Sequence, residues 1–412
     1  EGLKAIYVDP ILKIDLSESI PLINGEVEVE TQDNNSINSI ILTGKDQGVC
    51  VVDTGIYPHK DFAERIVDEQ CFCEVSDLGS GGCCPNAQSR DISALDDSIV
   101  SHGTKVAGVI ASNGKLRGVA PNSNIVAIKA CDFLGRCLGS DIIAAIDYCV
   151  SNGAKLNVAS LSGSFSDGKK YSNVGECPPI FDSALNSSLA NGIIPIFSSG
   201  NEFYRDGIGS PACSQYALSV GSYGVDVDGV SSEKNNGKNK KISDFSNTGR
   251  LLDIVAPGEN IESTSRNNRY SSSSGTSMAT PHVAGAIALI RQEEELLSLD
   301  SDKSRNYSIS NIMDALKFTG ELIGGYPSLD VRASVNLLSG GDLEGHIRPR
   351  MVEESSATPT EFGTLGEIEI LDDGSSIETL SLGDNKYSIL RSNVAGTNAT
   401  GTNVNYNSQN DY

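Results

Sequence analysis

Three side chains of the 412-residue chain are of the types that together perform nucleophilic catalysis. Asp53 ends the apolar run GVCVVD, His102 opens the helical pattern HGTKVAGVIA, and Ser277 precedes the apolar run MATPHVAGAIALI. A serine hydroxyl is a weak nucleophile at neutral pH, so it needs a base within hydrogen-bond reach and a partner that fixes the tautomer of that base. In such an arrangement Ser277 attacks, His102 accepts its proton, and Asp53 orients and stabilises the imidazolium.

Ser277 also stands where a negatively charged intermediate could be stabilised. It is at the expected N-terminus of a long helix, whose free backbone N–H groups can hydrogen-bond to a developing oxyanion. Gly275 before it allows the chain to turn tightly beside a substrate. Taken alone, Ser277 could be an ordinary helix cap and His102 an ordinary core histidine. Three such motifs in one chain favour the catalytic interpretation.

The catalytic candidates lie among alternating strand-like and helical segments. Six short segments are continuously apolar, which is typical of strands in a parallel sheet covered on both faces. These expected strands are residues 48–53, 124–130, 156–162, 192–201, 216–224 and 252–258. Helical patterns between them, as in 140–153 and 180–192, predict an open α/β fold. Reactive groups gather at the carboxyl ends of such strands, where Asp53 and Asn201 stand.

The three segments, in the order Asp, His, Ser, resemble the signature motifs of the subtilases, the subtilisin-like serine endopeptidases. DTG starts at Asp53, HGTKVAG starts at His102, and GTSMATPHVAG surrounds Ser277. The resemblance extends over residues 45–338. It implies a three-layer subtilisin-like α/β fold and a serine endopeptidase that hydrolyses peptide bonds through an acyl-enzyme. It also implies an inhibitory pro-domain before maturation, and chemistry that needs no metal or organic cofactor.

The resemblance assigns further residues to the oxyanion hole and to substrate binding. SSGN is similar to the strand end whose asparagine, here Asn201, completes the oxyanion hole. SLSG at 160–163 is similar to an edge that pairs with an extended substrate, and CDFLGRC at 131–137 falls where the facing edge should lie. The substrate-binding residues implied in this way are Ser160, Leu161, Ser162, Gly163, Ser199, Gly200, Leu134 and Gly135.

The chain departs from the family pattern at the expected specificity pocket. Ser198 and Ser199 stand where the family usually has alanines, and Ser162 stands where it usually has glycine. These changes place hydroxyls at the expected pocket walls, so the family's specificity does not transfer to this chain.

Metal binding is not assigned to any residue. The loop 112–118 is shorter than the loop that holds a tight calcium ion in bacterial members, so the resemblance implies that this site is missing. Structural calcium elsewhere stays open. Asp96, Asp97 and Glu202 could bind calcium, favour a basic P1 residue, or simply be solvated surface carboxylates.

The other three histidines are not assigned to catalysis. The family keeps a histidine at the position of His282 for packing. His59 and His346 lack a nearby signature and are expected on the surface.

Ten cysteines, all before residue 214, predict disulfides and an oxidising compartment, so we expect a protein that is secreted or lies in another extracytoplasmic oxidising compartment. The CFC and GGCCP cluster could instead hold zinc, but its spacing does not match the usual CxxC pattern. Cys131 and Cys137 are the easiest local pair because only a short loop separates them.

The net charge of −23 argues against nucleic acid and anionic membranes as partners, because both repel an acidic surface. We find no apolar run long enough to span a membrane. The charge does not identify a substrate, but the resemblance to the subtilases implies that the partner is a protein or peptide substrate.

Three regions are expected along the chain. Residues 1–40 form an N-terminal extension or pro-domain remnant, 41–340 the catalytic domain, and 341–412 a small β-rich extension with a flexible tail. Residues 1–24 resemble the junction between a pro-domain and a mature enzyme, but they could equally be an extension that packs on the catalytic domain. The absence of an initial Met suggests a processed chain. Residues 366–382 have the pattern of two alternating strands around a turn.

Two other functions are compatible with these motifs. The chain could be a catalytically silent subtilase-fold binding or scaffold protein, although such proteins usually lose a triad residue and none is missing here. An ester hydrolase is disfavoured, because such enzymes usually show GxSxG and GTSMA lacks the second glycine.

Overall fold

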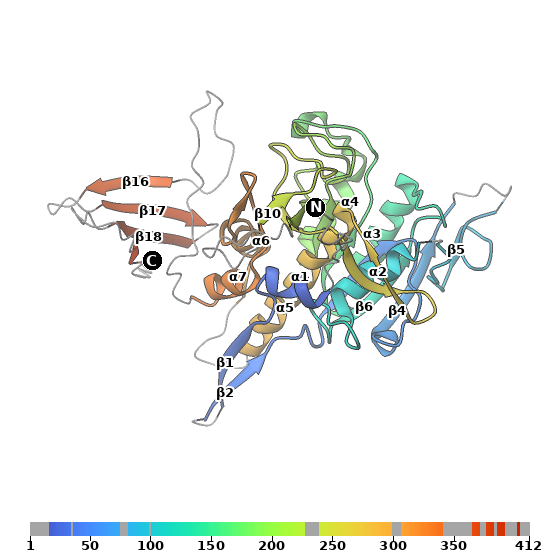
Figure 1. Cartoon of the computed structure of the whole chain (residues 1–412), viewed down its shortest axis with the longest axis horizontal. Coiled ribbons are helices and arrows are strands. Elements are labelled where there is room, and N and C mark those ends of the chain that lie inside the picture. The colour runs from blue at the N-terminus through green and yellow to red at the C-terminus, as the bar shows by residue number, and fades with distance from the viewer. Residues whose placement is uncertain are drawn as a thin grey trace, which may run out of the picture.

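The computed structural model (Figure 1) describes residues 16–33, 36–74, 81–98, 100–226, 239–298 and 306–340, with the backbone of four strands between 365 and 403. Within these residues the centre of the protein is a nine-stranded sheet. Its strands are β3 (Gly48–Asp53), β4 (Ile66–Phe72), β5 (Arg90–Asp91), β6 (Asn124–Lys129), β7 (Val158–Gly163), β8 (Ile194–Ser198), β9 (Leu218–Asp226), β10 (Asn239–Ile242) and β11 (Ile254–Pro257). Their spatial order is β10-β9-β8-β7-β3-β6-β4-β5, and β11 also pairs with β9. All neighbours are parallel except β9–β10 and β4–β5.

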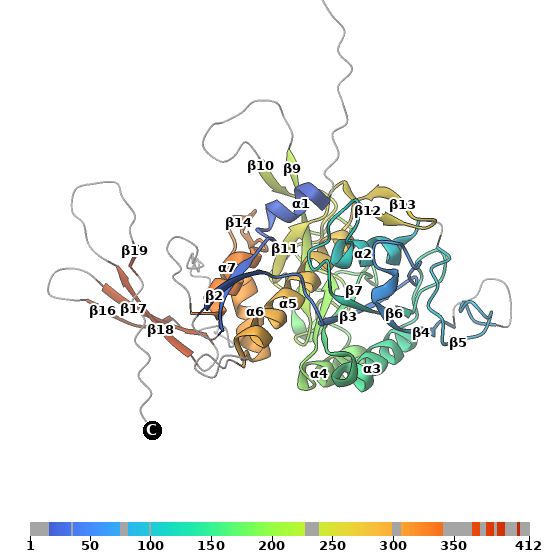
Figure 2. The same ribbon diagram turned by 90° about the horizontal axis from the view of Figure 1, so that it is seen from below.

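Helices cover both faces of this sheet. The described helices are α1 (Leu16–Leu22), α2 (His102–Ala111), α3 (Gly139–Leu156), α4 (Asp182–Ala190), α5 (Thr276–Ser298), α6 (Ile309–Phe318) and α7 (Val331–Leu338). Helices α2 and α5 pack against each other and against one face, while α3 and α4 pack on the other (Figure 2). The predicted three-layer α/β fold with a mostly parallel sheet is confirmed.

Strand β3 shows why the strand segments are continuously apolar. Val49 and Val51 lie in the hydrophobic core shared with α2 and α5, whereas Cys50 and Val52 lie in the core shared with α3 and α4. All four side chains are fully buried. Because alternate residues of a strand point to opposite faces, a strand buried on both sides has no polar position until it ends at Asp53.

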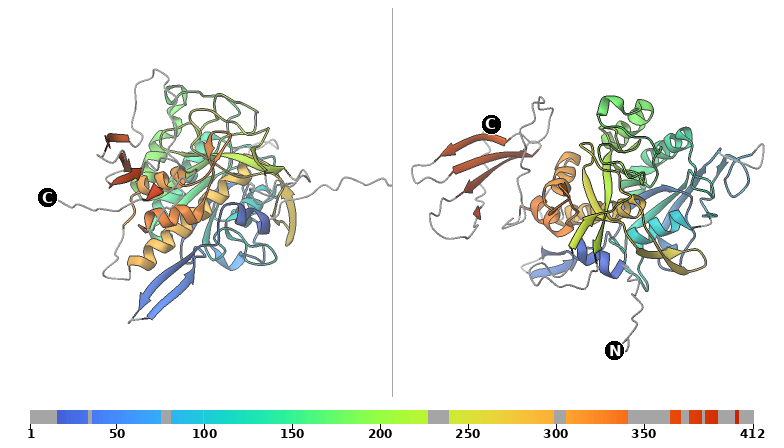
Figure 3. Two further views of the ribbon diagram at one scale, coloured as in Figure 1. Left: turned by 60° about the vertical axis from the view of Figure 1, so that its left-hand side comes forward. Right: turned by 45° about the horizontal axis from the view of Figure 1, so that its top comes forward.

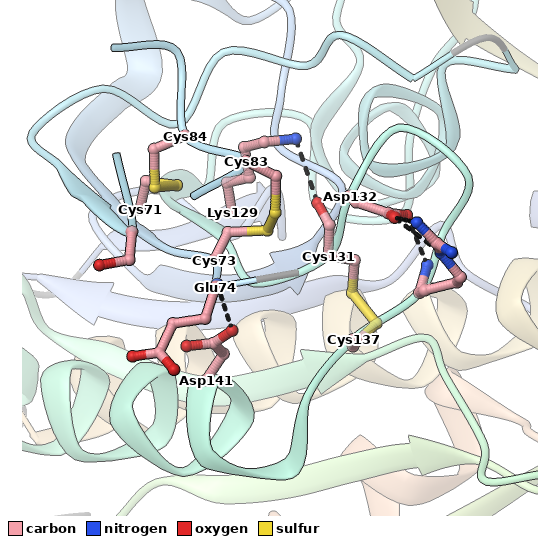
Figure 4. Close-up of a disulfide and its surroundings, with 12 residues drawn as sticks. Cys71, Cys73, Glu74, Cys83, Cys84, Lys129, Cys131, Asp132, Cys137 and Asp141 are labelled. Atoms are coloured by element: carbon pink, nitrogen blue, oxygen red, sulfur yellow. Dashed lines mark hydrogen bonds and ion pairs between the residues drawn. A yellow bond between two sulfur atoms is a disulfide. The ribbon is translucent and has the colours of Figure 1, made fainter. Parts of the chain in front are cut away.

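All ten cysteines lie in described parts of the chain, and they form five disulfides, as predicted. The pairs are Cys50–Cys149, Cys71–Cys84, Cys73–Cys83, Cys131–Cys137 and Cys177–Cys213. Figure 4 shows the two pairs of the CFC and GGCCP cluster beside Cys131–Cys137. Cys71 of this cluster belongs to β4, which pairs with β6.

The N-terminal residues from Ser19 onward pack on the main domain. Ile20, Ile23 and Val27 are buried in the core that α5 lines, and Ser19 is itself buried. This packing agrees with the alternative of an extension that rests on the catalytic domain. Of the pro-domain junction expected at 1–24, residues 1–15 lie outside the described residues.

Smaller antiparallel sheets complete the described structure. Their strands are β1 (Glu28–Asp33), β2 (Ser36–Ile41), β12 (Ile261–Ser265), β13 (Arg269–Ser273), β14 (Leu322–Ile323), β15 (Tyr326–Pro327), β16 (Leu365–Ile370), β17 (Ser376–Leu382), β18 (Asn385–Arg391) and β19 (Thr402–Asn403). The β1–β2 hairpin, which sequence reasoning missed, projects as a blue arm (Figure 3). The two expected strands within 366–382 are present as β16 and β17. The flexible tail expected at 393–412 lies outside the described residues, apart from β19.

Candidate active site

Asp53, His102 and Ser277 come together although they are far apart in the sequence. Asp53 is the last residue of β3, His102 the first of α2, and Ser277 the second of α5. His102 Nδ1 lies 2.7 Å from Asp53 Oδ1, and His102 Nε2 lies 3.0 Å from Ser277 Oγ. The Asp53 side chain is 3% exposed and that of His102 is 25% exposed. The acid is therefore withdrawn from water, while the imidazole remains accessible to a substrate.

The glycine after His102 allows α2 to approach β3 closely. A Cβ atom on Gly103 would lie 2.1 Å from the Gly55 carbonyl oxygen and 3.1 Å from Asp53 Cβ. Ser101, before His102, has a φ of 54°, in the left-handed region that residues other than glycine rarely adopt. Strained backbone of this kind is concentrated at functional sites, because the surrounding structure must hold it in place.

The electrostatics of the site favour His102 as a base. Burial lowers its pKa, but the charge of Asp53 and the hydrogen bond to that carboxylate raise it by more, so the net pKa lies above the ordinary 6.5. A higher pKa makes the neutral imidazole a stronger acceptor for the Ser277 proton.

Activity is expected to rise with pH along an acid limb centred above pH 6.5. Only neutral His102 can accept the Ser277 proton, so kcat/KM is lost as the pH falls through the raised pKa. Measuring kcat/KM for a peptide p-nitroanilide across the neutral range checks this prediction. A midpoint below 6.5 would contradict the assigned influence of Asp53.

Three groups converge on the space left by the missing side chain of Gly275. A Cβ atom there would lie 3.0 Å from Ser277 Oγ, 3.6 Å from Asn201 Nδ2 and 3.7 Å from the Ser277 backbone nitrogen. The orientation of the Asn201 amide is fixed, because its Oδ1 accepts the Thr276 N–H at 2.9 Å. Two N–H donors beside the nucleophile can stabilise an oxyanion that forms in this space.

Comparison with known proteins agrees with this geometry. The model of the subtilase family matches residues 44–318. The chain belongs to the subtilase family. It is 34% identical over 268 residues to the major intracellular serine protease of Bacillus subtilis (strain 168), covering 61% of this chain and 70% of that protein. It is 33% identical over 288 residues to subtilisin BL of Lederbergia lenta, covering 69% of this chain and 86% of that protein.

A solved structure of a protease from Pseudoalteromonas arctica PAMC 21717 has a similar fold. The TM-score is 0.58 at 23% identity, over 72% of this chain and 91% of that chain. With the family established, this subtilase is a serine-type endopeptidase.

The segment 160–163, expected to pair with substrate, lies in the central sheet of this subtilase. Ser160, Leu161 and Ser162 are fully buried in β7, and Gly163 is the buried last residue of that strand. Strand β7 pairs with β3 on one side and β8 on the other, and the substrate contacts of 160–163 stay a prediction. The chain leaves the sheet only afterwards, at 164–166, which are half-buried. There Ser164 Oγ donates to the Ser277 carbonyl at 3.4 Å.

The hydroxyls of Ser198 and Ser199, which stand where the family usually has alanines, form hydrogen bonds within the protein. Ser198 and Ser199 are buried. Ser198 Oγ donates to the Phe165 carbonyl at 3.2 Å, and Ser199 Oγ donates to the Asn247 carbonyl at 2.9 Å. They therefore brace neighbouring segments, and the substrate contacts of Ser199 and Gly200 stay predictions.

The other predicted substrate edge is a disulfide-closed loop that begins beside the acid. The Cys131 N–H donates to the Asp53 carbonyl at 3.2 Å. Asp132 holds the loop, since its carboxylate accepts the Leu134 N–H at 2.9 Å and pairs with the Arg136 guanidinium (Figure 4). Gly135 turns the chain at a φ of 82°, and Leu134 is 55% exposed. The substrate contacts of Leu134 and Gly135 stay predictions.

Sequence reasoning missed Lys129, which anchors the end of β3. Its fully buried ammonium donates to the Thr54 carbonyl at 2.9 Å and to Asp97 Oδ1 at 2.6 Å. A single lysine ending the apolar strand NIVAIK was the available signal. Asp96 is also buried and accepts from the Thr54 and Thr104 hydroxyls. Asp96 and Asp97 thus hold the DTG and HGT segments in place.

His59 and His282 are both buried. The surface prediction for His59 is wrong, because the rings of Phe62 and Tyr270 pack against it. Burial lowers the pKa of His282 to about 4, and its ring bonds to the Met278 carbonyl and to Ser19 Oγ, as a packing residue would. His346 lies outside the described residues.

Clusters of metal-ligating side chains and membrane-spanning helices were both sought in the described part of the chain. It contains no group of three or more His, Cys, Asp or Glu side chains placed to hold a metal ion. Beside the short loop 112–118, the Asp61 carboxylate accepts hydrogen bonds from the Ser112 and Tyr270 hydroxyls. None of the helices in these residues is long and apolar enough to cross a membrane.

Proposed function

We propose that this subtilase hydrolyses peptide bonds with Ser277 as nucleophile, His102 as general base and Asp53 as the partner that orients the imidazole. The observation that carries the proposal is the continuous hydrogen-bonded chain of 2.7 Å and 3.0 Å through the two nitrogens of one imidazole. No observation favours the alternative of a silent scaffold, because all three side chains are within hydrogen-bond distance.

The chemical steps follow from the positions of these groups. Ser277 Oγ attacks the substrate carbonyl carbon as its proton passes to His102 Nε2, and the C=O π electrons move to oxygen. Asn201 Nδ2 and the Ser277 N–H donate to that oxyanion. His102 then protonates the leaving amine, which leaves an acyl-enzyme. A water molecule, deprotonated by His102, then attacks the acyl carbon. The ester bond to Ser277 Oγ breaks, Ser277 recovers its proton from His102, and the acid is released.

An extended peptide is the proposed substrate. We assign the pairing with its backbone to two segments: 164–166, where Ser164 bonds to the Ser277 carbonyl, and the loop 131–137, which begins at the Asp53 carbonyl. The half-burial of 164–166 beside Ser277, and the Asp132-braced turn of the facing loop, support this assignment.

The five disulfides support an oxidising, extracytoplasmic location. One relative is named an intracellular protease, so the proposed location rests on the disulfides. An inhibitory pro-domain before maturation is also part of the proposal. Structural calcium is left unassigned.

A fluorophosphonate probe tests the proposed nucleophile. The wild-type protein should be labelled at one position, and mass spectrometry should place the label on Ser277. The His102→Ala variant is the matched control, because it keeps the serine but loses the base and should label far more slowly. A folded wild-type protein that is not labelled, or is labelled elsewhere, would overturn the assignment.

A further inference from the structure

We propose that Asn247 is a positioning residue that holds the oxyanion donor Asn201 in its productive geometry. Asn247 lies between β10 and β11, is fully buried, and belongs to none of the motifs that identify the catalytic residues. The inference rests on the proposed function, because it assigns Asn247 a role in the same acyl transfer.

The side chain of Asn247 uses both of its polar atoms on the segment around Asn201. Its Nδ2 donates to the Ser199 carbonyl at 3.0 Å and to Glu202 Oε2 at 2.6 Å. Its Oδ1 accepts the N–H groups of Glu202 at 3.0 Å and Tyr204 at 3.1 Å. One amide therefore satisfies two donors and two acceptors on both sides of the oxyanion donor.

The backbone of Asn247 adds further bonds to the same segment. Its N–H donates to the Gly200 carbonyl at 2.9 Å, and its carbonyl accepts the Ser199 hydroxyl at 2.9 Å. Asn201 itself is held from the opposite side, where its Oδ1 accepts from Thr276. The donor is thus fixed between the start of α5 and Asn247.

Gly200 is shaped for this contact. Its φ of 104° favours glycine, and a Cβ atom there would lie 2.4 Å from Asn247 Nδ2. The absence of a side chain allows Asn247 to reach the backbone immediately before Asn201. Glu202, just after Asn201, requires a donor opposite its carboxylate, so an aspartate at 247 would place two carboxylates together.

Asn247 should affect catalysis through the position of Asn201 Nδ2. Asn201 Nδ2 must lie within hydrogen-bond distance of an oxygen that becomes negative only in the transition state. A displacement of about 1 Å caused by a residue outside the chemistry can lower a rate about 10²-fold. Loss of Asn247 should therefore act on kcat and leave KM nearly unchanged.

A double-mutant cycle tests this role. Asn201→Ala should lower kcat about 10²- to 10³-fold, because one oxyanion donor is removed. Asn247→Ala and Asn247→Asp should each lower kcat about tenfold or more in the wild-type background. In the Asn201→Ala background the same changes should have almost no further effect, because the group that they position is gone. A merely structural role would lower kcat by the same factor in both backgrounds.

Ser219→Ala is the matched control. Ser219 is also fully buried, and its hydroxyl bonds to the Leu251 carbonyl and the Asp253 carboxylate, away from the Asn201 segment. This variant should keep the wild-type kcat. If Asn247→Ala does not fold, Asn247→Ser, which brings no second carboxylate to Glu202, carries the test. Unchanged kcat in a folded Asn247 variant, or equal effects in the two backgrounds, would overturn the proposal.

The result separates this inference from the function on which it rests. If Ser277→Ala keeps full activity, the proposed triad itself fails. If Ser277→Ala is inactive while the Asn201 and Asn247 effects multiply independently, only the positioning role fails.

Discussion

Replacing Ser277 with alanine is expected to lower kcat for peptide hydrolysis about 10⁶-fold, the loss seen when the serine of such a triad is removed. Ser277 Oγ is the atom within 3.0 Å of His102 Nε2, so without it the base has no nucleophile to activate. KM should change little, because the hydroxyl contributes little to ground-state binding. Initial rates with a peptide p-nitroanilide measure the effect.

Ser274→Ala is the control for this change. Ser274 is an exposed serine three residues earlier, whose Oγ accepts the Asn260 N–H at 2.8 Å, so this variant should retain the wild-type rate. A Ser277→Ala rate within about a hundredfold of wild type would mean that another group is the nucleophile. Some residual rate over water is expected, because the oxyanion donors remain.

The Asp53→Asn substitution is expected to lower kcat about 10⁴-fold while preserving the fold. Asp53 Oδ1 accepts hydrogen bonds from His102 Nδ1 and, at 2.7 Å, from the Thr54 N–H. An amide can turn its N–H₂ toward His102 and stabilise the tautomer whose Nε2 carries the proton. That tautomer cannot accept the proton of Ser277.

The pH dependence of the same variant gives an independent readout. The charge of Asp53 raises the pKa of His102, so removing that charge should move the acid limb of kcat/KM to lower pH. Asp206→Asn is the charge-matched control, because Asp206 is 69% exposed and pairs with Lys170 at the surface. Its limb should stay at the wild-type position. If the acid limb of kcat/KM in Asp53→Asn stayed at the wild-type pH, Asp53 would not be the group that raises the pKa of His102.

The local sequence determined those features that depend on short-range patterns. Val49 to Val52 are apolar because both faces of β3 are covered. The strand could therefore be predicted without knowing which strands pair with it. Asp53, His102 and Ser277 each stand in a short motif. The local geometry requires the glycines and hydroxyls of these motifs. The even set of cysteines likewise predicted disulfides from composition alone.

Tertiary structure decided whatever depends on which distant segments meet. Residues 160–163 are buried because β3 and β8 flank β7, and no local pattern shows where a two-sided pairing stops. His59 is buried because Tyr270, from β13, packs over it. Asn247 reaches the Asn201 segment across about 45 residues of chain, through bonds to backbone groups that every residue type carries. A hydrogen bond to a backbone group does not depend on the type of residue that carries this group. Such contacts therefore cannot be predicted from the sequence and are seen only in the folded structure.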